Sequence, residues 1–349
     1  MYSTFLIYTL FGSFSVVLAY LSQACKEKKH RILLVVITYL FVVSFWAFRY
    51  GIGFDYDSYI YIFYEIKNGY SSYVEPVYSF FSNLFSDTVN GEYWVIASMS
   101  VVTYLFLFYI FIKRKILALG LFFSLAFQYQ FMAANQIRQA LAISAFLCLL
   151  PLIEKKQTAK WIIGISLIVL LFHTSALFLF FLIPFCRINI SGKKWCLIIS
   201  ILFVAYLGGV FRQFGNLLFS ILPIPENYQH FLLSERVEAE QVGFSLVMLF
   251  NVIVALYIAW NYQLNKKRIF TLYMLGICMY IIFIEYHLLL RVSFYLFYVS
   301  IYIASIFCKE QPKKGQWLIL AAVIFSLFNF AQSTNMHGVI PYKTLFFNL

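Results

Sequence analysis

Short basic segments alternate with long apolar runs along the chain, and this alternation restricts the possible folds more than any other feature. Six basic segments hold most of the 26 basic residues, and only three of the 14 acids lie within them or directly beside them. They lie at 26–31, 113–115, 155–160, 187–194, 266–268 and 309–314. Loops rich in lysine and arginine stay on the cytoplasmic side of a membrane. These segments therefore indicate the inner face, and the acid-rich segments between the other apolar runs indicate the outer face.

A chain of 349 residues that is 63% hydrophobic and 11% charged is too apolar for a water-soluble core. The composition predicts an all-α polytopic integral membrane protein with about twelve transmembrane helices. Each is near the ~20 residues that cross a bilayer, or slightly shorter. They are expected at 4–22, 32–48, 93–112, 116–132, 136–153, 158–172, 174–190, 196–211, 243–262, 269–285, 288–307 and 316–332, with both termini outside.

The formal net charge of +12 does not indicate nucleic-acid binding, because no basic face carries interleaved aromatic residues. Most of the positive charge falls on the predicted inner face, where anionic membrane lipids are its expected partners. The six cysteines show no CxxC spacing, and the sequence contains no metal-binding motif. We therefore expect neither disulfides nor a metal or other cofactor.

The apolar stretch 161–186 is longer than one ordinary span and is interrupted at Phe172-His173-Thr174-Ser175. As a single tilted helix it would move every later basic segment to the outer side, against the positive-inside rule. We therefore expect two short helices or a re-entrant pair, with His173 at the outer turn.

The outer segments at about 49–92 and 212–242 are long, whereas the inner segments are short and carry little besides charge. Acids and aromatics recur in the first outer segment, which predicts short helices lying on the membrane surface. No soluble domain or internal repeat interrupts the pattern, so we expect one transmembrane domain over residues 1–349. Any chemistry is then expected on the outer face.

Arg138 and Arg291 each begin an apolar helix at its outer end, and Arg49 ends the second predicted helix. A charge near hydrocarbon costs ~2.5–3.5 kcal/mol on insertion scales, so such a residue usually faces a cavity or a partner. A structural ion pair, for example Arg291 with Glu285, is one alternative, and snorkelling to the headgroups is another. Several arginines on one side favour an anionic ligand, because a guanidinium matches the oxygens of a lipid diphosphate.

Three outer-face residues are candidates for a general base, namely His173, Asp55 and Glu75. A lone histidine in an apolar turn is more often held by a backbone carbonyl than catalytic, and most loop carboxylates are simply solvated. We nominate His173 first, with the two carboxylates as substitutes.

Several motifs occur in a recognisable order between about residue 40 and the C-terminus. They are Arg49-Tyr50-Gly51-Ile52-Gly53-Phe54-Asp55-Tyr56 with Tyr59 and then Glu75-Pro76, Asn135-Gln136-Ile137-Arg138-Gln139-Ala140-Leu141-Ala142, Phe172-His173-Thr174-Ser175-Ala176-Leu177, Arg291 with Tyr295, and Pro341-Tyr342. With this ordered set the chain resembles the EpsG/Wzy-type polysaccharide polymerases.

The resemblance implies a glycosyltransferase that joins undecaprenyl-diphosphate-linked oligosaccharide repeat units at the outer face of the bacterial inner membrane. It also implies a GT-C-like architecture, that of integral membrane glycosyltransferases with lipid-linked donors. On this basis Arg138 and Arg291, with Arg49 second, bind the diphosphate, and His173 activates the acceptor hydroxyl. The residues expected to support the site are Gln136, Gln139, Tyr295 and Tyr342. Whether a chain-length regulator binds stays open, as does the choice among O-antigen, capsule and exopolysaccharide.

Three other functions fit some of these features. A ligase of the O-antigen type would use the same arginines to move finished glycan from the lipid to another acceptor. A lipid-linked-sugar flippase or transporter would suit twelve spans, but it predicts charged or broken segments near mid-bilayer in paired halves. A membrane acyltransferase would use His173 but would need a second acidic or histidine partner accessible from the cytosol.

Overall fold

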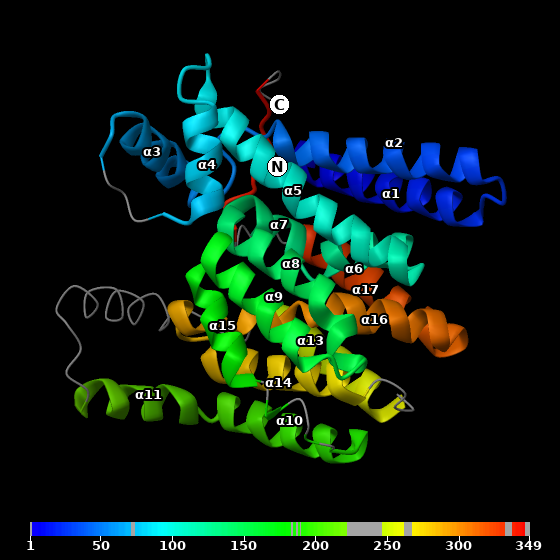
Figure 1. Cartoon of the computed structure of the whole chain (residues 1–349). Coiled ribbons are helices and arrows are strands. Elements are labelled where there is room, and N and C mark those ends of the chain that lie inside the picture. The colour runs from blue at the N-terminus through cyan, green and yellow to red at the C-terminus, as the bar shows by residue number, and fades with distance from the viewer. Residues whose placement is uncertain are drawn as a thin grey trace. The chain divides into compact units, whose positions relative to one another are not determined.

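The computed structural model describes residues 2–70, 74–182, 184–185, 188, 190–221, 246–261, 267–331 and 337–345. Within these ranges the regular structure is helical, and extended backbone pairs only in one antiparallel bridge, between Arg49 and Thr344. The predicted all-helical class is confirmed. The helices, most of them labelled in Figure 1, are α1 (Tyr2–Ala24), α2 (Lys28–Ala47), α3 (Tyr56–Lys67), α4 (Pro76–Leu84), α5 (Gly91–Arg114), α6 (Leu117–Ala126), α7 (Tyr129–Asn135), α8 (Ile137–Glu154), α9 (Thr158–Leu171), the 3-10 helix η1 (Thr174–Leu182), α10 (Gly192–Leu207), α11 (Val210–Ile221), α13 (Leu246–Asn261), α14 (Lys267–Phe283), α15 (His287–Phe297), α16 (Val299–Glu310) and α17 (Pro312–Ala331).

Every predicted membrane segment overlaps one helix or two consecutive helices. By length and hydropathy, five described stretches are able to cross a membrane: α1, α2, α5, α8 and the run Leu289–Glu310. A sixth is added if α6 and α7 form one broken span. The total of about twelve crossings and the GT-C-like architecture stay predictions. Most of the outer segment predicted at 212–242 lies outside the described residues, which stop at Ile221 and resume at Leu246.

The span expected at 116–132 is bent by 66° between α6 and α7. Gln128 at the break has a φ of 60°, in the left-handed region that few residues other than glycine adopt. Polar contacts hold the bend in place. Gln130 of α7 accepts a hydrogen bond from Trp46 Nε1 at 2.8 Å and donates one to Ser124 Oγ at 2.7 Å.

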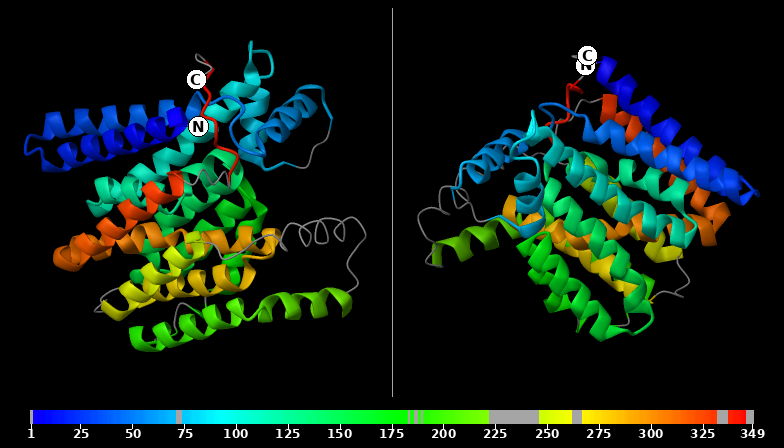
Figure 2. Two further views of the ribbon diagram at one scale, coloured as in Figure 1. Left: turned by 180° about the vertical axis from the view of Figure 1, so that it is seen from behind. Right: turned by 45° about the horizontal axis from the view of Figure 1, so that its top comes forward.

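Contacts divide the chain into two compact units, the first Met1–Phe180 with Ala304–Leu349 and the second Phe181–Ile303. In the first unit α1 lies beside α2, and α5 packs against α2 and α8 (Figures 1 and 2). In the second unit α14 packs closely against α15, and a Cβ added at Gly276 would lie 2.5 Å from the Leu296 carbonyl. One transmembrane domain over residues 1–349 stays a prediction.

Segments predicted to be on the outer side meet at one end of the first unit. The Tyr50 amide donates to the Lys343 carbonyl at 3.0 Å, and the Gly53 amide donates to the Gly338 carbonyl at 2.8 Å. Gly53 has a φ of 104°, and a Cβ there would lie 2.8 Å from the Ala134 carbonyl oxygen. The chain after α2, the end of α7 and the chain after α17 therefore converge.

The opposite ends of helices in the first unit also meet. The Lys309 ammonium donates to the Arg114 carbonyl at 2.7 Å, and the Ala118 amide donates to Gln23 Oε1 at 2.9 Å. All four residues lie within or near basic segments predicted to be cytoplasmic. These contacts agree with the assignment of those segments to a common face.

The apolar stretch around His173 is broken, as predicted. Helix α9 ends at Leu171, and the 3-10 helix η1 begins at Thr174. The His173 amide still donates to the Ile168 carbonyl at 3.1 Å, and the His173 carbonyl accepts from the Ala176 amide at 3.1 Å. The backbone therefore turns at His173 without leaving its own polar groups unsatisfied.

Arg49 is buried at the end of α2, where it is only 2% exposed. Its Nη1 donates to the Trp46 carbonyl and, at 3.0 Å, to Ser100 Oγ. Its Nη2 donates to the Ala134 carbonyl at 3.2 Å. None of these acceptors is a carboxylate. One guanidinium therefore joins the end of α2 to α5 and α7.

Replacing Arg49 by methionine should destabilise the protein, because buried acceptors on three elements would lose their donor at ~1–3 kcal/mol each. Abundance in the membrane and the midpoint of thermal unfolding in detergent measure this. Lys67→Ala, at an exposed cation ending α3, is the control and should change neither. Normal stability with lost activity would instead show that Arg49 contacts a substrate.

Candidate active site

Glu75, Arg138 and His173 come from three separate elements and meet in the first unit, and we refer to them as the Glu75 triad. Glu75 Oε2 accepts a hydrogen bond from Arg138 Nη1 at 2.6 Å. Glu75 Oε1 lies 2.5 Å from His173 Nδ1. A single carboxylate therefore bridges a permanent cation and an imidazole. All three were predicted as site residues, but their association was not.

The sequence Glu75-Pro76 explains why the carboxylate is free to make this bridge. Pro76 begins α4, where its fixed φ favours the first helical turn. Glu75 is extended just before it, with φ −60° and ψ 144°, and its side chain makes no capping hydrogen bond. The carboxylate, 8% exposed, turns toward Arg138 and His173.

Arg138 lies in the first turn of α8, between the carboxylate and two tyrosine rings. Its Cζ is 5.8 Å from the ring centroid of Tyr59 and 5.9 Å from that of Tyr78, within the range of a cation–π interaction. The Tyr78 hydroxyl donates to the Tyr59 carbonyl at 2.7 Å, which fixes α4 against α3. Tyr78 was not predicted as a site residue, although it lies three residues after Glu75 and so near the same helical face.

The ion pair of Arg138 is the structural alternative that the sequence left open, here with Glu75 as the partner. It does not occupy the whole guanidinium, whose side chain is 23% exposed. Arg138 Nε is buried and has no hydrogen-bond partner among the residues that the structure describes. The group therefore retains donors beyond those that Glu75 uses.

The contact with Glu75 sets the tautomer of neutral His173. An ionised carboxylate only accepts hydrogen bonds, so Nδ1 must carry the proton that lies between the two groups. Nε2 then has its lone pair free, and the side chain is 23% exposed. This is the arrangement by which a carboxylate orients a histidine base and stabilises its protonated form.

Glu75 itself is ionised. Burial raises the pKa of its carboxyl, but the hydrogen bond with His173 and the charge of Arg138 outweigh burial and lower that pKa to about 2. A carboxylate with so low a pKa is a weak base at neutral pH. Its geometry and charge suit it to orienting His173 rather than to accepting the proton.

Asp55 and Gln136 lie near the junction of α7 and α8. The Asp55 amide donates to Asn135 Oδ1 at 2.9 Å, which ties the start of α3 to the end of α7. Gln136 is 4% exposed, and no partner for its Oε1 exists within the described part of the chain. Gln139 is also buried.

Tyr342 is buried at the predicted outer end of the first unit. Its ring stacks on Phe45 with centroids 4.4 Å apart, and its hydroxyl donates to the Phe45 carbonyl at 2.8 Å. The Tyr342 amide donates to Thr4 Oγ1 at 3.2 Å. These contacts hold the C-terminal segment 338–345 beside the start of α1 (Figure 2).

Arg291 and Tyr295 belong to α15 in the second unit. Arg291 is partly buried, and Tyr295, one turn later, is fully buried. Glu285, the partner considered for Arg291, forms its ion pair with Arg212 at 2.9 Å. The structure thus brings together three of the predicted site residues and places Arg291 in a separate unit.

The stability contributed by Glu75 should fall with acidification. Glutamate has a pKa of ~4.3 in an unfolded chain, and in the fold the pKa of Glu75 is about 2. The contribution is fully present above the unfolded value and is lost as pH falls through the folded value. Wild type should therefore unfold at a higher temperature than Glu75→Gln, and this difference in thermal midpoint should decrease as the pH falls from about 5 to about 3. A difference that increased over this range would contradict the ionised bridge.

The surface pair Glu27–His30, 2.9 Å apart with both side chains more than half exposed, provides a matched control. Glu27→Gln should change the midpoint little across the same range, because exposed ion pairs contribute little.

Comparison with known families identifies the family of this chain. The family model described as the EpsG family matches residues 32–344. No curated protein and no solved structure matches the chain. Since the family match covers nearly the whole chain, including every residue of the Glu75 triad, this protein belongs to the EpsG family of Wzy-type polysaccharide polymerases.

Proposed function

We propose that this protein transfers a growing glycan from undecaprenyl diphosphate to a hydroxyl of the next lipid-linked repeat unit, at the outer face of the bacterial inner membrane. The observation that carries the proposal is the Glu75 triad, in which a histidine oriented by a carboxylate lies beside a partly exposed arginine. Family membership supports the polymerase reaction, and the triad supplies the two functions that this reaction needs.

His173 is the proposed base. The acceptor hydroxyl attacks the anomeric carbon of the donor glycan, the bond from that carbon to the diphosphate oxygen breaks, and the hydroxyl proton passes to His173 Nε2. The imidazolium that forms is stabilised by Glu75, whose carboxylate remains ionised. Asp55 is the alternative base, because its amide donates to Asn135 at the end of α7, three residues before Arg138.

Arg138 is the proposed donor to the leaving diphosphate. Its partly exposed guanidinium retains N–H groups that Glu75 does not use, and these suit an anion whose charge increases as the bond breaks. Arg291 belongs to the second unit, and its predicted role in binding the diphosphate stays a prediction. The burial of Arg49 favours a positioning role, in which it holds the loop that leads to α3.

Arg138→Ala should reduce polymerisation by ~10²–10³-fold, because one preorganised donor to the developing charge is removed. A gel of cell-surface polysaccharide should show single repeat units without long chains, at normal membrane abundance of the protein. Lys67→Ala is the control for removal of a cation. A wild-type ladder from Arg138→Ala would contradict the proposed role of Arg138.

Two other outcomes would indicate other functions. Accumulation of long lipid-linked chains would indicate a ligase, and repeat units retained on the inner face would indicate a flippase.

His173→Ala should reduce the rate by ~10²–10⁴-fold, the usual contribution of a general base. Glu75→Gln should lose less, because the imidazole remains present but is no longer held by an anion. Initial rates with purified protein and lipid-linked substrate test this order. A normal rate for His173→Ala together with an inactive Asp55→Asn variant would transfer the role of base to Asp55.

A further inference from the structure

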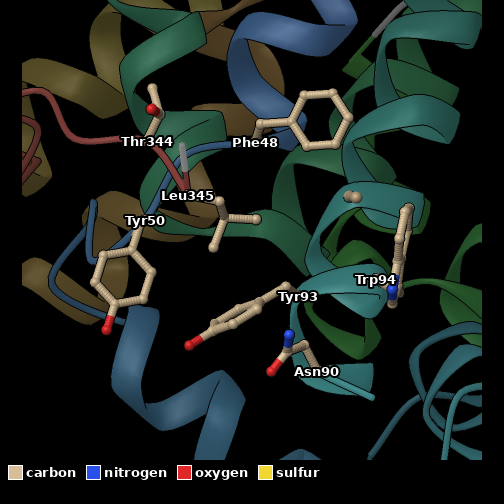
Figure 3. Close-up of a pocket in the computed structure, with 8 residues that line it drawn as sticks. Phe48, Tyr50, Asn90, Tyr93, Trp94, Thr344 and Leu345 are labelled. Carbon is tan, nitrogen blue, oxygen red and sulfur yellow. The ribbon is translucent and has the colours of Figure 1, made fainter. Parts of the chain in front are cut away.

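A pocket of about 560 Å³ opens in the first unit beside the start of α5 (Figure 3). Its walls include Phe48 and Tyr50 after α2, Asn90, Tyr93 and Trp94 at the start of α5, and Leu345 from the C-terminal segment. The volume lies within the ~300–1,000 Å³ of small-molecule sites, which combine apolar walls with a few polar groups.

The pocket presents aromatic faces and polar tips together. Tyr50 is 40% exposed and Trp94 is 46% exposed, so both rings are accessible. Asn90 is exposed as well, and its side chain makes no capping hydrogen bond with α5 although it precedes the first turn. Its amide is therefore oriented for contacts outside the helix, with both a donor and an acceptor.

This combination suits a sugar ring. The C–H groups on one face of a pyranose carry partial positive charge and fit the negative face of an aromatic ring. Its hydroxyls both donate and accept hydrogen bonds, as do an asparagine amide and tyrosine hydroxyls. Two alternatives explain these features less well. A pocket for a lipid chain would need only apolar walls, and aromatic residues that merely anchor the protein at the membrane interface would need neither a concave wall nor an amide.

The C-terminal segment makes the pocket a built feature of the fold. The Leu345 amide donates to the Phe48 carbonyl at 2.9 Å, and the neighbouring Thr344 bridges to Arg49. Backbone pairing therefore fixes one wall against another that is distant in sequence. Asn90, just before α5, belongs to another wall of the pocket. Its φ is 57°, a left-handed conformation that asparagine adopts more readily than most residues.

The pocket and the Glu75 triad rest on one aromatic core. Tyr93 packs against the buried cluster that contains Tyr59 and Tyr78, the two rings beside Arg138. The Tyr50 ring lies 5.7 Å from that of Tyr93 and 6.2 Å from that of Tyr56, a member of the same cluster. A glycan chain engaged at the triad thus has an aromatic pocket built on the same cluster.

We infer that this pocket is a saccharide subsite, which binds a sugar unit of the glycan away from its diphosphate. The inference rests on the proposed polymerase function and adds where the glycan itself is held. Such a subsite would retain the growing chain between transfers, so that its loss should shorten chains more than it slows single additions.

Binding can be measured without catalysis. The probe is a set of oligosaccharides of one to three repeat units, released by partial acid hydrolysis from the polysaccharide of cells that carry this protein. Titration calorimetry of the full chain in phospholipid nanodiscs should show saturable binding. Trp94→Ala and Tyr50→Ala should each weaken it about three- to tenfold, the contribution of one aromatic contact. Trp94→Phe should restore most of the affinity.

Trp317→Ala is the matched control, because Trp317 is 67% exposed on α17 and does not line the pocket. Equal affinities for wild type and Trp94→Ala, or no saturable binding by wild type at millimolar oligosaccharide, would overturn the subsite. In cells, Trp94→Ala should shift the polysaccharide ladder to shorter chains at unchanged protein abundance.

Failure of the subsite and failure of the proposed function are separable. Glu75→Gln should keep oligosaccharide affinity within about twofold of wild type while polymerisation falls. Normal polymerisation by Glu75→Gln and Arg138→Ala, with sugar binding weakened in Trp94→Ala and Tyr50→Ala, would reject the proposed chemistry and leave the subsite intact. Loss of polymerisation in those two variants, with affinity unchanged in Trp94→Ala, would reject the subsite alone.

Discussion

The carboxylate of Glu75 is the group on which the predicted outer end of the first unit depends. It accepts from Arg138 and contacts the ring nitrogen of His173, so α4, α8 and the turn after α9 share one anion. A charged arginine at the end of an apolar helix is costly unless it has a partner, and the same partner fixes the imidazole. Pro76, which starts α4, and the Tyr78–Tyr59 hydrogen bond, which holds α4 against α3, keep that anion in place.

The positive charge of Arg49 is stabilised by different groups from those that stabilise Arg138. Its neighbours are carbonyl and hydroxyl oxygens, so the buried cation is held by partial charges alone. Two arginines with similar positions at helix ends therefore differ in environment, in keeping with the different roles proposed for them. Arg138 remains partly exposed beside a carboxylate, whereas Arg49 is enclosed where three elements meet.

The sequence supported correct predictions wherever the signal was local. Hydropathy located segments that each overlap a helix, and the polar interruption at His173 correctly predicted a break there. The bend between α6 and α7 was missed, because hydropathy does not register the left-handed backbone at Gln128. The bridge at Glu75 was missed for another reason: it joins residues far apart in the chain, and no spacing rule predicts such a meeting. The pocket near Trp94 depends equally on the return of residues 343–345 to Phe48 and Tyr50.

The pairing of the C-terminal segment with the chain after α2 also has a consequence for biogenesis. Residues 338–345 follow α17, so the membrane insertion machinery receives them only after the preceding helices have been delivered. Their partners Tyr8, Phe48 and Gly53 precede α3 in the sequence and must wait until α3 to α17 have been synthesised. Contacts of such long sequence separation form late in folding. An incompletely inserted polypeptide would thus lack the pocket wall that this segment forms. The predicted outer end of the first unit would then stay incomplete until the last helix is inserted.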